Sequence, residues 1–220
     1  MNPENRLDKA LAQMPVIAIL RGIAPDEALD VGRRLVKAGV LAIEIPMNSP
    51  EPFESIRILA ENLPSEVLVG CGTVTTRAHV VQAIDAGAEL VVHPHADEEL
   101  VRLAAGAGKV SVPGVFTPTE AFKMISAGAT ALKLFPSELI TPQAVSALKA
   151  VLPDGTRLVS VGGISTENMH EYWEAGIRAF GLGSTIYRKG MAPEDVEHAI
   201  CAVEKVGRQL TQGLSLSGVK

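Results

Sequence analysis

A lysine interrupts the apolar run at residues 131–135, which read Ala-Leu-Lys-Leu-Phe. Successive side chains of a β-strand point to opposite faces, so Leu132 and Leu134 share one face and Lys133 takes the other. If the leucines pack against helices, Lys133 points into an apolar interior. Burial lowers the pKa of a lysine and frees the neutral amine to attack a carbonyl carbon. The structural alternative is a lysine that reaches the rim or pairs with an acid.

A glutamate occupies the equivalent place at residues 42–46, which read Ala-Ile-Glu-Ile-Pro. Ile43 and Ile45 are expected to face helices, and Glu44 the interior. A buried amine and a buried carboxylate suit an imine reaction, in which the lysine carries the carbonyl carbon and the glutamate moves protons. A structural ion pair between Lys133 and Glu44 is the alternative, although desolvation can cancel the attraction within such a pair.

Two glycine-rich segments follow later apolar runs. They read Val-Gly-Gly-Ile-Ser at 161–165 and Gly-Leu-Gly-Ser at 181–184. Glycine lets backbone N–H groups come close to phosphate oxygens, and the loops after the last two strands of a (β/α)8 barrel commonly bind phosphate. We therefore expect Gly162, Gly163 and Ser184 at a phosphate site. The alternative is that the glycines only permit tight packing.

Further polar residues close other apolar runs. Arg21 can bind a carboxylate or a phosphate, or form a salt bridge, and Thr73 offers a hydroxyl after a Gly-Cys-Gly segment. His93 and His95 end another run. Two histidines without a third ligand are a weak sign of a metal site. We expect them to line or support the site, and we predict no metal.

These features lie in or directly after eight short apolar runs. They cover residues 16–20, 42–45, 67–69, 90–92, 110–112, 131–135, 158–161 and 179–182. Each is too short for a buried helix and lacks strict alternation, as expected for parallel strands covered on both faces. Stretches with helical spacing lie between them, at residues 25–37, 52–61, 78–86, 97–105, 117–127, 142–151 and 166–175. The Ala-Gly pairs at residues 38–39, 86–87, 127–128 and 175–176 suit the left-handed ends of helices.

Strands that alternate with helices predict a single-domain (β/α)8 TIM barrel over residues 1–220. Residues 1–14 are expected to form an extra N-terminal helix over the lower mouth of the barrel. The tail from about Gly213 is expected to fray. An open doubly wound sheet is the alternative, but it would prefer fewer strands and a glycine-rich turn after the first one.

The composition excludes several classes of protein. The net charge of -5 argues against a nucleic-acid-binding surface, which needs a basic patch. The longest uncharged stretches, such as residues 10–20, span about eleven residues, whereas a membrane-spanning helix needs roughly 20 apolar residues. The N-terminus has no apolar core of a signal peptide. Because Cys71 and Cys201 form no disulfide framework, we expect a cytoplasmic protein.

With these residues in place, the sequence resembles the KDPG/KHG aldolases, a family of pyruvate-dependent aldolases that cleave 2-keto-3-deoxy-6-phospho sugar acids. The resemblance extends over about residues 15–199, and its most specific segments are 17–23, 44–50, 132–137, 161–163 and 181–184. Within the family the chain is most similar to the 2-dehydro-3-deoxy-6-phosphogalactonate branch. Relatives specific for the gluconate epimer typically carry an arginine where this chain has Asn48, which, together with Arg21, favours the galactonate branch.

The resemblance implies a homotrimeric class I aldolase that needs no cofactor or metal ion. Lys133 would form the Schiff base and Glu44 would be the general acid/base. The implied substrate contacts are Arg21, Thr73, Gly162, Gly163 and Ser184. The products would be pyruvate and D-glyceraldehyde 3-phosphate. Two other functions stay open at this point: a phosphosugar isomerase or epimerase on the same barrel, and a non-catalytic module that binds phosphorylated metabolites.

Overall fold

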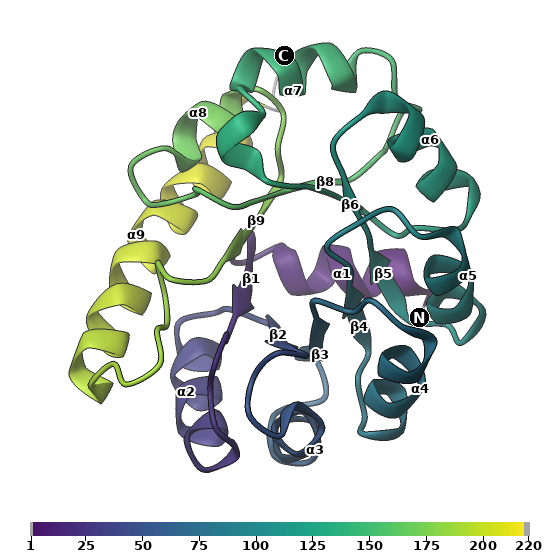
Figure 1. The fold of residues 1–220 in the computed structure, drawn as a ribbon. Helices are drawn as coiled ribbons and strands as arrows, with labels where there is room; N and C mark the ends of the chain where they lie inside the picture. The colour runs from purple at the N-terminus through teal and green to yellow at the C-terminus, as the bar shows by residue number, and fades with distance from the viewer. Residues whose placement is uncertain (1, 218–220) are drawn as a thin grey trace.

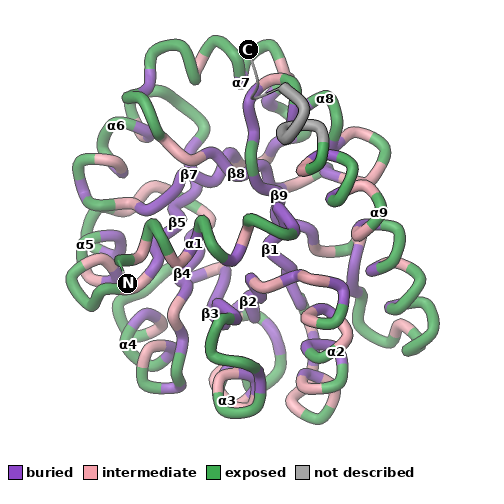
Figure 2. Tube along the Cα trace, turned by 180° about the vertical axis from the view of Figure 1, so that it is seen from behind, coloured by how far each residue is buried: buried purple, intermediate pink, exposed green. Residues whose placement is uncertain are grey.

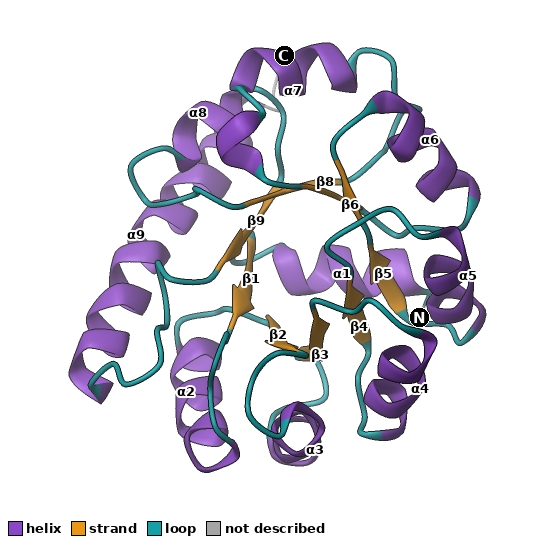
Figure 3. Cartoon of the chain, viewed as in Figure 1, coloured by secondary structure: helices purple, strands orange, loops and turns teal. Residues whose placement is uncertain are grey.

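Parallel strand segments form the sheet at the centre of the molecule (Figure 3). The structure is a computed structural model that describes residues 2–217, with side chains described up to residue 212. The segments are β1 (Val16–Ile19), β2 (Ala42–Pro46), β3 (Leu68–Gly72), β4 (Leu90–Val92), β5 (Val110–Val112), β6 (Gly114–Val115), β7 (Leu132–Leu134), β8 (Leu158–Val161) and β9 (Ala179–Leu182). They pair in the order β5-β4-β3-β2-β1-β9-β8-β7-β6.

The sheet closes on itself at Pro113, the one residue between β5 and β6. Proline lacks a backbone N–H and interrupts a strand ladder, but its carbonyl accepts a hydrogen bond from Lys133 N at 2.9 Å. Because β5 pairs with β4 and β6 pairs with β7, the two ends of the sheet are consecutive pieces of one chain segment. The (β/α)8 barrel predicted from the sequence is confirmed, and the open doubly wound sheet is not.

Helices surround the strands (Figure 1). They are α2 (Pro25–Lys37), α3 (Pro52–Asn62), α4 (Arg77–Asp85), α5 (Glu98–Gly106), α6 (Pro118–Ser126), α7 (Pro142–Lys149), α8 (Met169–Glu174) and α9 (Pro193–Ser217), with a short 3-10 helix η1 (Ser137–Leu139) after β7. No helix within residues 2–217 is long and apolar enough to cross a bilayer.

Most of these helices agree with the sequence-based prediction to within one or two residues. The helix predicted at 166–175 starts later, at Met169, because the Asn168 side chain accepts a hydrogen bond from Ser165 N at 2.9 Å and holds a turn there. α9 was not identified from the sequence. It extends to Ser217 and so overlaps the tail expected to fray from about Gly213, while residues 218–220 lie outside the described part of the chain.

Two buried apolar layers lie on opposite sides of the strands. Ile43, Ile45, Leu132 and Leu134 belong to the layer between strands and helices, which confirms the predicted facing of these pairs. The layer inside the ring includes Ile17, Ile19, Ala42, Leu68, Leu90, Val92, Val110, Val112, Val159 and Val161. Figure 2 shows the buried residues gathered along the strands. A side chain that points inward therefore meets an apolar environment.

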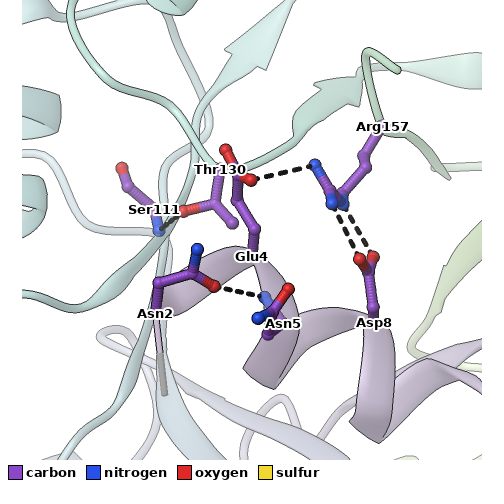
Figure 4. A network of polar contacts seen from close by, with 7 residues as sticks. All are labelled: Asn2, Glu4, Asn5, Asp8, Ser111, Thr130 and Arg157. Atoms are coloured by element: carbon purple, nitrogen blue, oxygen red, sulfur yellow. Dashed lines mark hydrogen bonds and ion pairs between the residues drawn. The ribbon is translucent and has the colours of Figure 1, made fainter.

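Helix α1 (Pro3–Leu11) crosses one end of the ring, as Figure 2 shows. Its Leu7 and Ala10 are buried in the inner layer. Asp8 accepts two hydrogen bonds of 2.7 Å from Arg157, and Glu4 lies 3.9 Å from the same guanidinium group (Figure 4). Asn2 caps the helix by accepting a hydrogen bond from Asn5 N. The extra N-terminal helix expected from the sequence is therefore present and covers the lower mouth.

Glycines end four of the helices in the left-handed conformation that the sequence predicts. Gly39, Gly87, Gly128 and Gly176 follow α2, α4, α6 and α8, and their φ angles lie between 87° and 105°. Residues with a side chain rarely adopt such angles. Each glycine turns the chain from a helix into the strand that follows.

Candidate active site

Lys133 is buried inside the barrel, with only 5% of its surface exposed. It is the middle residue of β7, and its leucine neighbours face the helices. Its Nζ lies 4.5 Å from the centroid of the Phe135 ring, close enough for an attraction between the ammonium and the π-electrons. Burial lowers the pKa of Lys133; the carboxylate of Glu44 opposes this shift and the guanidinium of Arg21 adds to it. The inward-facing lysine predicted from the sequence is present, and its burial shifts the equilibrium toward the neutral amine.

Glu44 is the inward-facing residue of β2 and is 2% exposed. Burial raises its pKa to about 7, although the positive charges of Lys133 and Arg21 act in the opposite direction. Its Oε2 has no hydrogen-bond partner among the residues that the structure describes. A carboxyl group with a pKa near neutrality and a free oxygen can both accept and donate a proton at physiological pH.

The two groups enter the same interior from different parts of the ring. β2 and β7 are separated in the sheet by β1, β9 and β8. Because the neighbours of Glu44 and Lys133 face the helices, both of these side chains project into the space that the strands enclose. Each charge affects the pKa of the other.

Arg21, Asn48 and Thr73 form a polar cluster after β1, β2 and β3. Arg21 Nη1 donates a hydrogen bond of 2.8 Å to Asn48 Oδ1, and Nη2 donates one of 3.4 Å to Thr73 Oγ1. Thr73 has a φ of 55°, a conformation that costs energy for a residue branched at Cβ. The sequence predicted Arg21 and Thr73 in one site, but it did not identify Asn48 as the residue that orients the arginine. No local signal indicates that contact, because the two residues are 27 positions apart.

The glycine-rich loops after β8 and β9 are neighbours, because Val161 pairs with Gly181. Gly162 and Gly163 have φ angles of 94° and 68°, so their backbone needs glycine. The Asn168 side chain donates a hydrogen bond of 2.8 Å to the Gly163 carbonyl and holds the loop. Ser184 is exposed directly after β9. The three residues predicted for phosphate therefore lie on adjacent loops at the carboxyl ends of strands, where a barrel binds anions.

The two histidines do not form a joint site. His93 is fully buried, its Nε2 lies 3.4 Å from Ser111 Oγ, and burial lowers its pKa to about 4. His95 is exposed, and its Nε2 lies 3.8 Å from Asp97. Among the residues that the structure describes, no three His, Cys, Asp or Glu side chains are grouped to hold a metal ion.

Comparison with known families decides among the activities that such a site allows. The sequence profile of the KDPG and KHG aldolases matches residues 7–203, a range that contains every candidate site residue. The chain belongs to the KDPG and KHG aldolase family. It is therefore an aldolase, a lyase that breaks a carbon–carbon bond. The alternatives of a phosphosugar isomerase and of a non-catalytic binding module are not favoured.

Individual relatives of this aldolase carry names that agree with the family assignment. It is 46% identical over 190 residues to the "Probable 2-dehydro-3-deoxy-6-phosphogalactonate aldolase" of Rhizobium meliloti (strain 1021), covering 86% of this chain and 90% of that protein. It is 42% identical over 200 residues to the "2-dehydro-3-deoxy-6-phosphogalactonate aldolase" of Escherichia coli (strain K12), covering 91% and 98%. The solved structure "Native KDPGal structure" superposes with a TM-score of 0.88 at 42% identity, covering 91% of this chain and 97% of the other.

Proposed function

We propose that this aldolase cleaves 2-dehydro-3-deoxy-6-phosphogalactonate to pyruvate and D-glyceraldehyde 3-phosphate through a Schiff base at Lys133. The buried pair carries the proposal: Lys133 and Glu44 enter the apolar barrel interior from β7 and β2. The galactonate substrate is supported by the names of the two relatives above. Asn48 supports it as well, since members of the family specific for the gluconate epimer typically carry an arginine there.

Lys133 starts the reaction. Its neutral Nζ forms a bond to C2 of the substrate, and the carbonyl electrons move to oxygen. Loss of that oxygen as water leaves an iminium ion, whose positive nitrogen withdraws electrons from the C3–C4 bond. The lowered pKa of Lys133 increases the fraction of amine that can attack.

Glu44 moves the protons of the later steps. As a carboxylate it takes the proton of the C4 hydroxyl, directly or through a water molecule, while the C3–C4 bond breaks and its electrons form an enamine. The C4–C6 portion leaves as the aldehyde. The enamine carbon C3 then takes a proton, and addition of water to the resulting imine releases pyruvate and restores Lys133. A pKa near 7 suits a group that must alternate between both forms.

The polar residues around the pair suggest how the substrate lies. Arg21, held by Asn48 and Thr73, presents its positive charge near Glu44 and Lys133. This position suits the C1 carboxylate next to the reacting carbonyl. Gly162, Gly163 and Ser184 would bind the C6 phosphate through backbone N–H groups and a hydroxyl.

Assembly and location follow from the family resemblance. The chain would act as a single barrel domain in a homotrimer in the cytoplasm, without a cofactor or metal ion. Its ligands would be small phosphorylated acids rather than nucleic acid or membrane.

Trapping with pyruvate and borohydride tests the proposal. Borohydride reduces the imine that pyruvate forms with a lysine and makes the link permanent, so intact-mass measurement shows the adduct. Peptide mapping should find it on Lys133, because among the lysines that the structure describes this one alone combines burial in the barrel with a lowered pKa. Lys133→Ala should take up no pyruvate and lose essentially all turnover of the phosphorylated substrate while remaining folded.

Lys123→Ala is the matched control, because Lys123 is exposed on α6. This variant should be trapped and should turn over like the unmodified protein. An adduct on Lys109 or Lys123, or none at all, would contradict the Schiff-base assignment.

A further inference from the structure

Gly72, the last residue of β3, faces the carboxyl group of Glu44 across the β2–β3 pair. A Cβ atom built on Gly72 would lie 1.5 Å from Glu44 Oε2, 2.1 Å from Cδ and 2.4 Å from Oε1. These are its three nearest atoms, and all belong to one carboxyl group. The Glu44 carboxyl group therefore occupies the place that a side chain at residue 72 would fill.

The backbone does not explain this glycine. Gly72 lies in a regular parallel strand, paired with Pro46, and does not have a positive φ angle. Glycine in a strand weakens the strand, because it adds flexibility and packs no side chain. Gly70 in the same strand differs, since a Cβ there would lie 2.0 Å from the carbonyl oxygen of Leu90, so Gly70 is required by backbone packing.

The Glu44 carboxyl group would have to move if residue 72 carried a side chain. Glu44 is 2% exposed, and the positive charges of Lys133 and Arg21 act on its carboxyl group. Van der Waals contact needs about 3.5 Å between heavy atoms, so a methyl group at residue 72 would displace the carboxyl group by more than a bond length. That displacement would change where it can reach the substrate.

We infer that Gly72 is a positioning residue for catalysis: its missing side chain creates the space in which the Glu44 carboxyl group lies opposite Lys133. The inference rests on the proposed function, which makes Glu44 the group that moves protons. Gly72 itself has no side chain to contact the imine or the phosphate. It acts through Glu44 alone.

A double-mutant cycle tests this role. The variants are Gly72→Ala, Glu44→Asp and the two combined, and the readouts are kcat for cleavage of the phosphorylated substrate and the melting temperature. Gly72→Ala should lower kcat by roughly 100-fold or more, on the scale of losing a positioned general acid/base. Aspartate is one methylene shorter, which withdraws the carboxyl group toward β2 and removes most of the overlap with the methyl group. In the Glu44→Asp background, the same substitution should therefore lower kcat by less than about threefold, which is a strong coupling between the sites.

If Gly72→Ala folds poorly, comparing its melting temperature in the two backgrounds still tests whether the added methyl group clashes with Glu44. A clash with Glu44 should lower the melting temperature in the unmodified background and not in the Glu44→Asp background. Gly106→Ala is the matched control, since a Cβ there meets nothing within 4 Å, and it should change neither readout.

Equal losses from Gly72→Ala in both backgrounds, in kcat and in melting temperature, would overturn the inference and make Gly72 a structural residue. Normal kcat in the Gly72→Ala single variant would overturn it too. If the unmodified protein traps no pyruvate, the proposed function falls and this inference falls with it. Normal trapping combined with equal losses would remove only the role of Gly72.

Discussion

Two ionisable side chains inside this barrel have pKa shifts in opposite directions. The apolar interior raises the pKa of Glu44 and lowers that of Lys133, in each case because burial disfavours the charged form. Their mutual attraction opposes both shifts and does not cancel either. Burial thus favours the neutral amine of Lys133, and Glu44, with a pKa of about 7, can exchange its proton near neutral pH. An imine reaction needs both.

Glu44→Gln keeps the shape of the side chain and removes the exchangeable proton. We expect turnover to fall by about 10²–10⁴-fold, the usual scale for a general acid/base. In the proposed mechanism the carboxylate form accepts the C4 hydroxyl proton, so kcat/KM of the unmodified enzyme should rise as pH increases through about 7. Steady-state rates between pH 5 and 9 measure this rise in kcat/KM, which should be absent in Glu44→Gln.

Pyruvate trapping serves as the control for that variant. It should still occur on Lys133, though more slowly, because the nucleophile is intact. If kcat/KM of Glu44→Gln still rose through pH 7 as in the unmodified enzyme, the proton transfer would belong to another group.

At the scale of elements, strand pairing brings the two glycine-rich loops together. β8 and β9 are adjacent, and their loops meet at the same end of the barrel. Gly163 also packs against η1, since a Cβ there would lie 2.7 Å from the Cβ of Glu138. The loop therefore combines a conformation that only glycine adopts readily with a close contact to a neighbouring segment.

Gly163→Ala should move the backbone N–H groups away from the phosphate. We expect KM for the phosphorylated substrate to rise about tenfold or more, the scale of one lost hydrogen bond to a charged group. Pyruvate trapping should change little, because pyruvate has no phosphate. Gly155→Ala is the control: it has a similar φ of 81° and no neighbour within 4 Å, so it tests the backbone strain alone. Equal effects on substrate and pyruvate would make Gly163 structural.

Helix α1 closes the barrel at the end opposite the site, and its stability contribution comes from buried apolar atoms. Leu7 is fully buried, whereas Lys9 on the same helix is exposed. Leu7→Ala should reduce the free energy of unfolding by about 2–5 kcal/mol, as expected for a core leucine. Lys9→Ala should change it by less than about 0.5 kcal/mol. Urea denaturation measures both, and equal values would mean that α1 is not part of the core.

At the scale of the whole molecule, the isolated chain leaves several large apolar side chains in contact with water. Phe116 is 49% exposed, Phe122 on α6 is 43% exposed and Leu139 on η1 is 68% exposed. Single exposed apolar residues are common, but aromatic side chains are enriched in contacts between subunits. Together with the family resemblance, they favour an assembly of several chains.

Sedimentation equilibrium should therefore give a mass about three times the 23.2 kDa of one chain. A trimer covers apolar surface that a monomer would leave exposed. The mass should remain the same over a tenfold range of protein concentration. A mass of one chain, or a dimer, would contradict the homotrimer.

Much of the fold follows from local features of the sequence. Short apolar runs separated by helical stretches predict parallel strands that are covered on both faces, and the side-chain alternation of a strand puts Lys133 and Glu44 on the inner face. The Ala-Gly pairs mark helix ends because only glycine adopts φ angles such as 105° at Gly176 without strain. These properties depend on residues within a few positions of one another. They can be deduced before any tertiary contact is known.

The contacts between distant segments and the pKa values of the buried pair are decided only by the tertiary structure, because they depend on the closure of the ring. Pro113 closes the barrel between β5 and β6, Arg21 meets Asn48 and Thr73 across the strand ends, and the Glu44 carboxyl group lies against Gly72. Each of these contacts joins segments that are distant in the chain, and its geometry depends on strand register. The pKa values of Glu44 and Lys133 depend on closure as well, because only the completed barrel removes both groups from water.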